Sequence, residues 1–222
     1  MLLLKKKQLF NLKKNSVISF VGYANFIKIN LNTLNSINWF VDGIILSKVF
    51  NLLNINVEKN SFDFTGVAND IFLMCVKNNY KIHFIGGDFN DSKTFKIKIQ
   101  KKYPNLQISC QDGYKSLNSF KFSNLSEIDI CVYGMGSPLQ ETLAIKHKNL
   151  FTYSFTCGAF ISQIARSQKK DYYSPFVIRF QLRWLYRIYH EKGHFMRLFK
   201  AFLRIGEIYV KAKKIKTKNK TE

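Results

Sequence analysis

The chain has 222 residues, of which 46% are hydrophobic and 22% are charged. This length fits one domain with a substantial core, and this composition excludes wholesale disorder. The formal net charge is +21, and basic residues concentrate at both ends, around Lys5–Lys7 and from Arg179 to Lys220. Such an excess of positive charge favours a polyanionic partner, either a membrane surface or a nucleic acid.

The spacing of the cysteines and the length of the apolar runs argue against further classes of protein. The four cysteines are widely spaced without a C-x-x-C pair, which indicates reduced thiols in a cytoplasmic protein and argues against a zinc ribbon. The run Met1–Leu4 is too short for a signal peptide, and lysines follow it instead of preceding it. No run of about 18 uncharged apolar residues occurs, so we expect no transmembrane span.

Apolar strands alternate with helices along most of the chain. A buried strand is expected at residues 17–21, followed by a mixed segment that reaches Gly43. Further strands are expected at 81–85, 106–110, 128–133 and 150–155, and helices near 44–53, 67–78, 92–103 and 137–148. This alternation predicts an α/β fold with a Rossmann-like, mostly parallel sheet and crossover helices.

Several of these strands end in glycine-containing turns. The turns contain Gly86–Gly87, Gly113 and Gly134–Gly136. Because ligands of parallel sheets bind beyond the carboxyl ends of the strands, we expect these glycines to cluster at one edge and to line a binding site.

The segment Gly134–Glu141 reads G-M-G-S-P-L-Q-E and is the most informative in the chain. Ser137 is predicted to be a helix N-cap, with Pro138 at the first helical position. The N–H groups and the positive dipole end of that helix would favour a diphosphate. A capping box between Ser137 and Gln140 would explain these two residues equally well, but not the two glycines before them.

Beyond Arg179 the sequence predicts a long, amphipathic and basic helical region. Basic residues flank its apolar stripe: Arg197, Lys200, Arg204 and Lys211. This pattern favours a helix that lies on an anionic bilayer over aromatic stacking on bases. We therefore divide the chain into an α/β domain, residues 1–178, and a basic helical appendage and tail, residues 179–222.

The segment Gly134–Glu141 closely resembles the G-x-G-x-P-x-Q-E signature of the WecG/TagA/CpsF transferases, glycosyltransferase family 26. Other short motifs follow in the family's order: Asp42-Gly43, Ser61-Phe62-Asp63, Phe84–Gly87, Tyr103-Pro104, Gly113-Tyr114 and Trp184–Arg187. Each motif is weak alone, and the resemblance rests on their shared order and spacing over roughly residues 17 to 205.

The resemblance implies a bacterial glycosyltransferase that moves an N-acetylhexosamine, uronic acid or hexose from a UDP-sugar to a polyprenyl-diphosphate-linked acceptor. Such an enzyme would serve polysaccharide or teichoic-acid-type synthesis, peripherally at the cytoplasmic face of the membrane, with its basic C-terminal helix on the anionic surface. The nucleotide-sugar is a substrate, so no cofactor is expected. The resemblance implies transfer with inversion. Because the sequence has no D-x-D triplet, we expect metal-independent transfer and no metal site.

The resemblance also implies residue roles. Asp42 resembles the proposed base that deprotonates the acceptor hydroxyl, although an Asp-Gly pair also serves as a turn. Arg187 resembles the arginine that the C-terminal segment offers to the leaving pyrophosphate. The expected donor-site residues are Asn25, Gly86, Gly87, Gly113, Tyr114, Gly134, Gly136, Ser137, Pro138, Gln140 and Glu141. Expected acceptor or phosphate contacts are Lys59, Asp63, Arg197 and Arg204.

The sequence departs from the family pattern at four places. Tyr23 replaces a Thr, Lys59 an Arg, Phe160–Ser162 a Phe-Asp-Phe motif and Arg183 a Glu. Since Lys cannot reproduce the planar fork of Arg, a retuned donor or acceptor site is expected.

Two other interpretations stay open: a nucleic-acid-binding protein that uses the basic termini, and an inactive scaffold of the same fold. Binding and turnover of a UDP-sugar would separate the enzyme from both. The H-E-x-x-H match of His190–His194 is not interpreted as a zinc site, because Gly193 weakens the helix and the neighbouring basic residues repel a dication.

Overall fold

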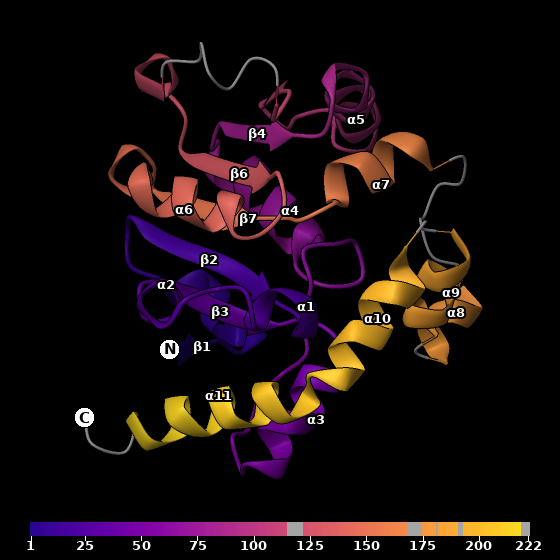
Figure 1. Ribbon diagram of the computed structural model, residues 1–222. Coiled ribbons are helices and arrows are strands. Elements are labelled where there is room, and N and C mark those ends of the chain that lie inside the picture. Colours follow the sequence, from indigo (N-terminus) through magenta and orange to yellow (C-terminus); the bar gives the residue numbers. More distant parts are fainter. Residues whose placement is uncertain (115–121, 168–174, 181, 191–192, 219–222) are drawn as a thin grey trace.

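In the residues that the structure describes, seven parallel strands form one sheet. The structure, a computed structural model, describes residues 1–114, 122–167, 175–180, 182–190 and 193–218, and for some residues of helices and of β1 only the backbone. The strand order is β1-β3-β2-β7-β6-β4-β5, and every neighbouring pair runs parallel. Helices cover both faces of the sheet (Figure 1), which confirms the expected Rossmann-like α/β fold.

The strands are short, and the central ones are buried on both faces, as expected for parallel strands covered by helices. They are β1 (Leu2–Leu3), β2 (Ser16–Val21), β3 (Asn38–Val41), β4 (Ile82–Gly86), β5 (Ile108–Gln111), β6 (Ile130–Gly134) and β7 (Tyr153–Thr156).

Helices α3, α5 and α6 directly follow strands β3, β4 and β6 and belong to connections that lead to the next strand. The described α-helices are α1 (Tyr23–Phe26), α2 (Leu31–Asn35), α3 (Ile44–Leu52), α4 (Ala68–Asn78), α5 (Phe89–Lys102), α6 (Leu139–Lys146), α7 (Phe160–Arg166), α8 (Pro175–Arg179), α9 (Arg183–His190), α10 (His194–Leu203) and α11 (Ile205–Lys218). Short 3-10 helices are η1 (Lys6–Asn11), η2 (Phe122–Leu125) and η3 (Lys148–Leu150). Helix α5 begins earlier than expected, because the Asp88 side chain accepts the N–H of Asp91 at 2.8 Å and caps it.

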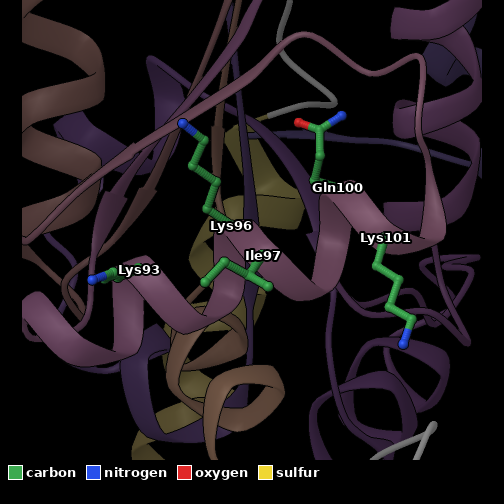
Figure 2. A pocket seen from close by; sticks show the side chains of 5 residues that line it. All are labelled: Lys93, Lys96, Ile97, Gln100 and Lys101. Atoms are coloured by element: carbon green, nitrogen blue, oxygen red, sulfur yellow. The ribbon is translucent and has the colours of Figure 1, made fainter.

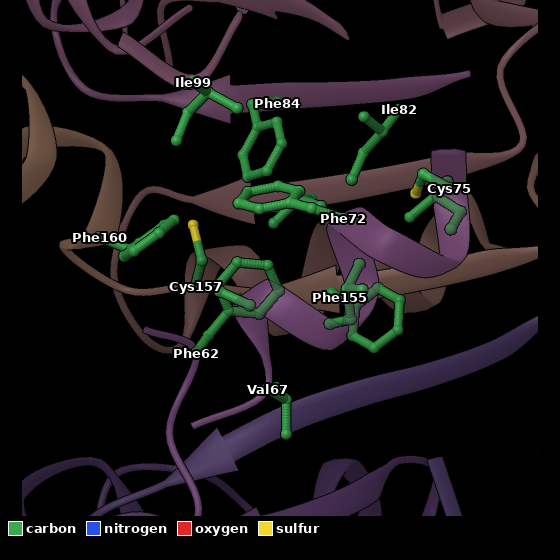
Figure 3. Packing of buried hydrophobic residues seen from close by; sticks show 14 of the residues in the cluster. Phe62, Val67, Phe72, Cys75, Ile82, Phe84, Ile99, Phe155, Cys157 and Phe160 are labelled. Atoms are coloured by element: carbon green, nitrogen blue, oxygen red, sulfur yellow. The ribbon is translucent and has the colours of Figure 1, made fainter. Parts of the chain in front are cut away.

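One face of the sheet is covered by α4, α5 and α7 through a cluster rich in phenylalanine (Figure 3). The ring centroids of Phe84 and Phe95 lie 4.8 Å apart, and those of Phe62 and Phe160 lie 5.4 Å apart. Phe72 completes this packing against Phe84 at 6.0 Å. Aromatic pairs at these distances add to the free energy gained by burying their area.

The opposite face is covered by α1, α2, α3, α6 and the C-terminal helix α11. In α11 the side chains of Ile208, Ala212 and Ile215 are buried and join Val49 and Phe50 of α3 in one cluster. The C-terminal helix therefore packs against the N-terminal half of the chain (Figure 1). The division of the chain at residue 179 stays a prediction.

Two parts of the chain differ from the sequence-based expectation. The mixed segment contains β3, and the N-terminus contains β1, because pairing between strands orders runs too short to be recognised alone. Beyond Arg179, the expected long helix is divided into α9, α10 and α11, with Gly193 at φ 76° between the first two. No helix among the described residues is both long and apolar enough to cross a membrane.

Phe84→Ala should lower the free energy of unfolding by about 3–5 kcal/mol, because it removes a ring from a closely packed cluster. Phe84 is 0% exposed, whereas Phe89 at the start of α5 is 69% exposed. Phe89→Ala should change the free energy by less than about 0.5 kcal/mol. Urea denaturation measures both, and equal effects would contradict this packing.

Candidate active site

The turns after β4, β5 and β6 meet at the carboxyl edge of the sheet. Gly86 pairs with Gly134 in the register of β4 and β6, and the N–H of Gly113 donates to the Gly87 carbonyl at 3.0 Å. A Cβ atom on Gly86 would lie 2.4 Å from the carbonyl oxygen of Gly134. One on Gly113 would lie 2.8 Å from the Cα of Gly86. The expected clustering is confirmed, and glycine is required because these backbones lie too close together for side chains.

The turn between β6 and α6 differs from the predicted cap. Helix α6 begins at Leu139 with Pro138 at its N-cap, and the Ser137–Pro138 peptide is cis. The Ser137 hydroxyl accepts a hydrogen bond from Asn25 at 3.3 Å, and the Gln140 amide donates to Glu141 at 2.9 Å. The predicted N-cap at Ser137 and its capping box with Gln140 are therefore wrong, because both side chains bind other partners.

Asn25 joins the turn after β2 to this loop. Its Oδ1 accepts the N–H of Gly22 at 2.7 Å, which holds the side chain against the start of α1. Its Nδ2 lies 3.2 Å from the Phe20 carbonyl and 3.3 Å from the Ser137 hydroxyl. Asn25 and Ser137, both predicted as donor-site residues, thus lie together at the sheet edge.

Gln140 and Glu141 lie beneath the edge and are 3% and 0% exposed. Glu141 Oε1 accepts hydrogen bonds from the Ser19 hydroxyl at 3.0 Å and from Gln140 at 2.9 Å. The hydroxyls of Ser19 and Thr156 share a hydrogen bond of 2.7 Å. These contacts connect α6 to β2 and β7, the neighbouring strands at which the two halves of the sheet meet.

Sequence reasoning missed Ser19 and Thr156. Both are buried, Ser19 within β2 and Thr156 at the end of β7, and the signal that could have found them is that a buried hydroxyl requires a partner. Glu141 Oε2 and Gln140 Oε1 are also buried, and neither has a hydrogen-bond partner among the described residues. Buried polar atoms of this kind commonly bind an ordered water, so this cluster offers acceptors just below the edge.

Asp42 follows β3 at the adjacent strand end. Its N–H donates to the Val21 carbonyl at 2.8 Å, so the residue lies beside the end of β2. Gly43 adopts a φ of 87°, which directs the chain into α3 and explains the glycine. Asp42 and Asn25 therefore follow two neighbouring strands and flank the same part of the edge.

Lys59 and Asp63 lie on the segment that passes beside β3. Lys59 is exposed and forms an isolated parallel bridge with Val41. The Asp63 carboxylate accepts hydrogen bonds from the Ser61 hydroxyl at 2.8 Å, the Thr65 N–H at 2.8 Å and the Thr65 hydroxyl at 2.6 Å. These bonds fix the turn before α4, while the predicted acceptor contacts of both residues stay predictions.

The other predicted residues lie farther along the chain. Tyr114 follows Gly113 and is 59% exposed. The backbones of Arg187 and Arg197 lie in α9 and α10, but both side chains lie outside the described residues. Arg204 forms an exposed pair with Glu207, in which Nε and Nη2 donate at 3.0 and 2.6 Å, so a carboxylate already offsets its charge.

Cysteine and histidine side chains do not form a site of their own in the described segments. Burial raises the pKa of the Cys75 and Cys131 thiols to about 12, so they stay protonated. Burial lowers the pKa of His83 to about 4. The residues of the H-E-x-x-H match do not share one helix, because α9 ends at His190 and α10 begins at His194. Glu191 and Lys192 lie outside the described residues.

A surface hollow on α5 lies apart from this edge (Figure 2). It is lined by Lys93, Lys96, Ile97, Gln100 and Lys101, all from one helix. It has neither a carboxylate nor a strand-end glycine, so we assign the active site to the sheet edge.

A parallel sheet with glycine turns at its carboxyl edge is typical of proteins that bind a nucleotide there. The sequence profile described as "Glycosyl transferase WecG/TagA/CpsF family" matches residues 32–219, and the chain belongs to this family. This membership makes the chain a glycosyltransferase and favours the enzyme over the nucleic-acid-binding and scaffold alternatives.

Two relatives with named activities illustrate the family. A UDP-Gal:alpha-D-GlcNAc-diphosphoundecaprenol beta-1,4-galactosyltransferase from Shigella boydii is 35% identical over 188 residues, which cover 80% of this chain and 78% of the relative. An N-acetylglucosaminyldiphosphoundecaprenol N-acetyl-beta-D-mannosaminyltransferase from Staphylococcus aureus (strain NCTC 8325 / PS 47) is 27% identical over 116 residues. That match covers 50% of this chain and 44% of the relative.

Gly86→Ala should abolish UDP binding in isothermal titration calorimetry, because the new Cβ would displace the Gly134 carbonyl that it meets at 2.4 Å. Overpacking of this kind should also lower stability by about 1–3 kcal/mol. Gly206→Ala is the control, since no atom lies within 4 Å of a Cβ at that position in α11. Unchanged UDP affinity in Gly86→Ala would place the nucleotide elsewhere.

Proposed function

We propose that this glycosyltransferase moves a sugar from a UDP-sugar to a polyprenyl-diphosphate-linked sugar, with inversion at the anomeric carbon and without a metal ion. The observation that carries the proposal is the convergence of the glycine turns, the Asn25–Ser137 contact and Asp42 at one edge of the sheet. The product would be a lipid-linked precursor of a cell-surface polysaccharide or teichoic-acid-type polymer.

The donor diphosphate is assigned to the loop Gly134–Ser137. This loop leads into α6, whose N-terminal dipole favours negative charge. No atom lies within 4 Å of a Cβ built on Gly136, so the backbone there is open to a phosphate group. Asn25 supplies a side-chain amide beside Ser137, while the buried Glu141 supports the loop from below through Ser19.

The names of the relatives guide the choice of sugars. Both names specify N-acetylglucosamine on diphosphoundecaprenol as the acceptor, so we assign this acceptor to the chain. The Shigella enzyme, which matches 80% of this chain, is named for UDP-galactose, and UDP-galactose is therefore the first donor to test. N-Acetylmannosamine, the sugar in the Staphylococcus name, is the second.

Asp42 is assigned as the general base. Its carboxylate would take the proton of the acceptor hydroxyl while that oxygen attacks the anomeric carbon of the donor. The bond between that carbon and the diphosphate oxygen breaks, and its electron pair leaves with UDP. Arg187 is assigned to the leaving diphosphate, where its positive charge would supply the stabilisation that a metal ion gives in other transferases.

Asp42→Asn should reduce turnover by roughly two to four orders of magnitude, because the amide cannot accept the proton. UDP affinity and thermal stability should stay close to wild type, since the backbone contact with Val21 is retained. The assay uses N-acetylglucosaminyl diphospholipid with UDP-galactose and other UDP-sugars, with and without EDTA, and identifies the glycolipid by mass. Turnover near wild type in folded Asp42→Asn would move the base elsewhere.

The anionic inner leaflet of the cytoplasmic membrane is proposed as the partner of α8, α9 and α10. Large apolar residues on these helices, and Phe180 directly after α8, are 48% to 87% exposed: Phe176, Phe180, Leu185, Tyr189, Phe195, Met196, Phe199, Phe202 and Leu203. Exposed apolar surface of this extent marks an interaction site, and the acceptor lipid stays in the bilayer. Helix α11, which the sequence grouped with them, buries its apolar side in the core, so it is left out of the assigned surface.

The double variant Phe199→Glu and Phe202→Glu should lose binding to anionic phospholipid vesicles in a flotation assay. Lys200→Ala should weaken binding more at low salt than at high salt, because salt screens the attraction. Leu52→Glu is the control, since Leu52 is 77% exposed on α3, which is not one of the assigned helices. Vesicle binding that survives the double substitution, or equal competition by duplex DNA, would contradict the membrane role.

A further inference from the structure

The ammonium group of Lys211 in α11 binds the backbone at residues 26–29. It donates to the Phe26 carbonyl at 2.5 Å, to the Ile27 carbonyl at 3.2 Å and to the Ile29 carbonyl. It also lies 5.2 Å from the centroid of the Phe26 ring. An ammonium has three N–H donors, and three carbonyls meet them here. Lys211, which the sequence grouped with the membrane-facing residues, is therefore bound within the protein.

The helix around Lys211 is fixed by its apolar neighbours. Ile208, Ala212 and Ile215 are 0%, 0% and 5% exposed and follow one another at spacings of four and three residues. With Lys211 between them, they form one face of α11, directed at the N-terminal half of the chain. The ammonium can leave the carbonyls only by extending into solvent or by release of the helix.

The turn that Lys211 holds also carries Asn25. Helix α1 has four residues, too few to be stable without tertiary contacts. The Asn25 carbonyl accepts the N–H groups of Lys28 and Ile29 at 2.9 and 3.0 Å, so Asn25 and the bound carbonyls belong to one turn. At its other end, this turn reaches Ser137 through the Asn25 side chain.

We propose that Lys211 is a positioning residue of the donor site. By holding residues 26–29, its ammonium keeps the Asn25 amide against Ser137, so that the packed helix α11 is needed for full affinity toward the donor. The inference rests on the proposed function in one respect, the assignment of the UDP-sugar to the loop beside Asn25. Charged groups that bind the last carbonyls of a helical turn stabilise it, which is the physical basis of the effect.

Lys211→Met removes the three donors and keeps the length of the side chain. With a water-soluble, short-chain acceptor, which makes a bilayer unnecessary, the KM for the UDP-sugar should rise roughly tenfold while the KM for the acceptor stays unchanged. Lys213→Met, an exposed position of the same helix, should change neither constant. Lys211→Arg should recover part of the affinity, because a guanidinium still donates to carbonyls.

A double-mutant cycle separates positioning from general stability. If Lys211 acts through Asn25, Lys211→Met should change the donor KM by less than about twofold in the Asn25→Ala background. Independent, multiplicative effects would overturn the proposal, as would an unchanged donor KM in folded Lys211→Met.

Amide hydrogen exchange tests the same contact without a substrate. Exchange at residues 25–29 should accelerate in Lys211→Met and not in Lys213→Met, and unchanged exchange would overturn the proposal. A wild-type protein that neither binds UDP nor transfers a sugar would instead refute the proposed function, and with it the assigned role of Asn25.

Discussion

The close approach of backbones at the carboxyl edge of the sheet is the constraint on which the site depends. Parallel strands bring all their carboxyl ends to one side, so the turns after β4, β5 and β6 lie close together. Glycine is needed at residues 86, 113 and 134, because a Cβ atom there would lie closer to a neighbouring atom than packing allows. The loop into α6 can lie at this edge only because these side chains are absent.

A second connection joins the far ends of the chain. Helix α11 packs on α3 and binds the turn after α1, so the last described helix reaches the first strand-to-helix turn of the proposed donor site (Figure 1). Helices α8 to α10 precede this anchored helix in the chain and expose large apolar side chains. The C-terminal region therefore has a part whose apolar side is buried, α11, and a part whose apolar side chains are exposed, α8 to α10. The sequence pattern did not distinguish the two.

Periodicity predicted the elements that have long, continuous apolar runs. The apolar runs that became β2, β4 and β6 and the glycines that end them were enough to predict the parallel sheet and its binding edge. Strand β3 was missed because its four residues become ordered by pairing with β2. The helix start at Leu139 was displaced because the Ser137 hydroxyl accepts from Asn25, far away in sequence.

Long-range contacts account for the rest of what the sequence left out. The partner of the buried Ser19 hydroxyl, Glu141, lies 122 residues later in the sequence. Lys211 followed the pattern of a solvated flank, and its carbonyl partners lie more than 180 residues away. The contacts of both side chains exist only in the folded chain, so the local periodicity of the sequence could not predict these contacts.

A crystal structure of the protein with bound UDP would show whether the nucleotide lies at the carboxyl edge of the sheet. We expect diphosphate oxygens within about 2.7–3.2 Å of backbone N–H groups in the Gly134–Gln140 segment, with the Asn25 amide beside them. UDP bound at the lysine-lined hollow of α5, or at any place apart from the carboxyl edge of the sheet, would contradict this expectation.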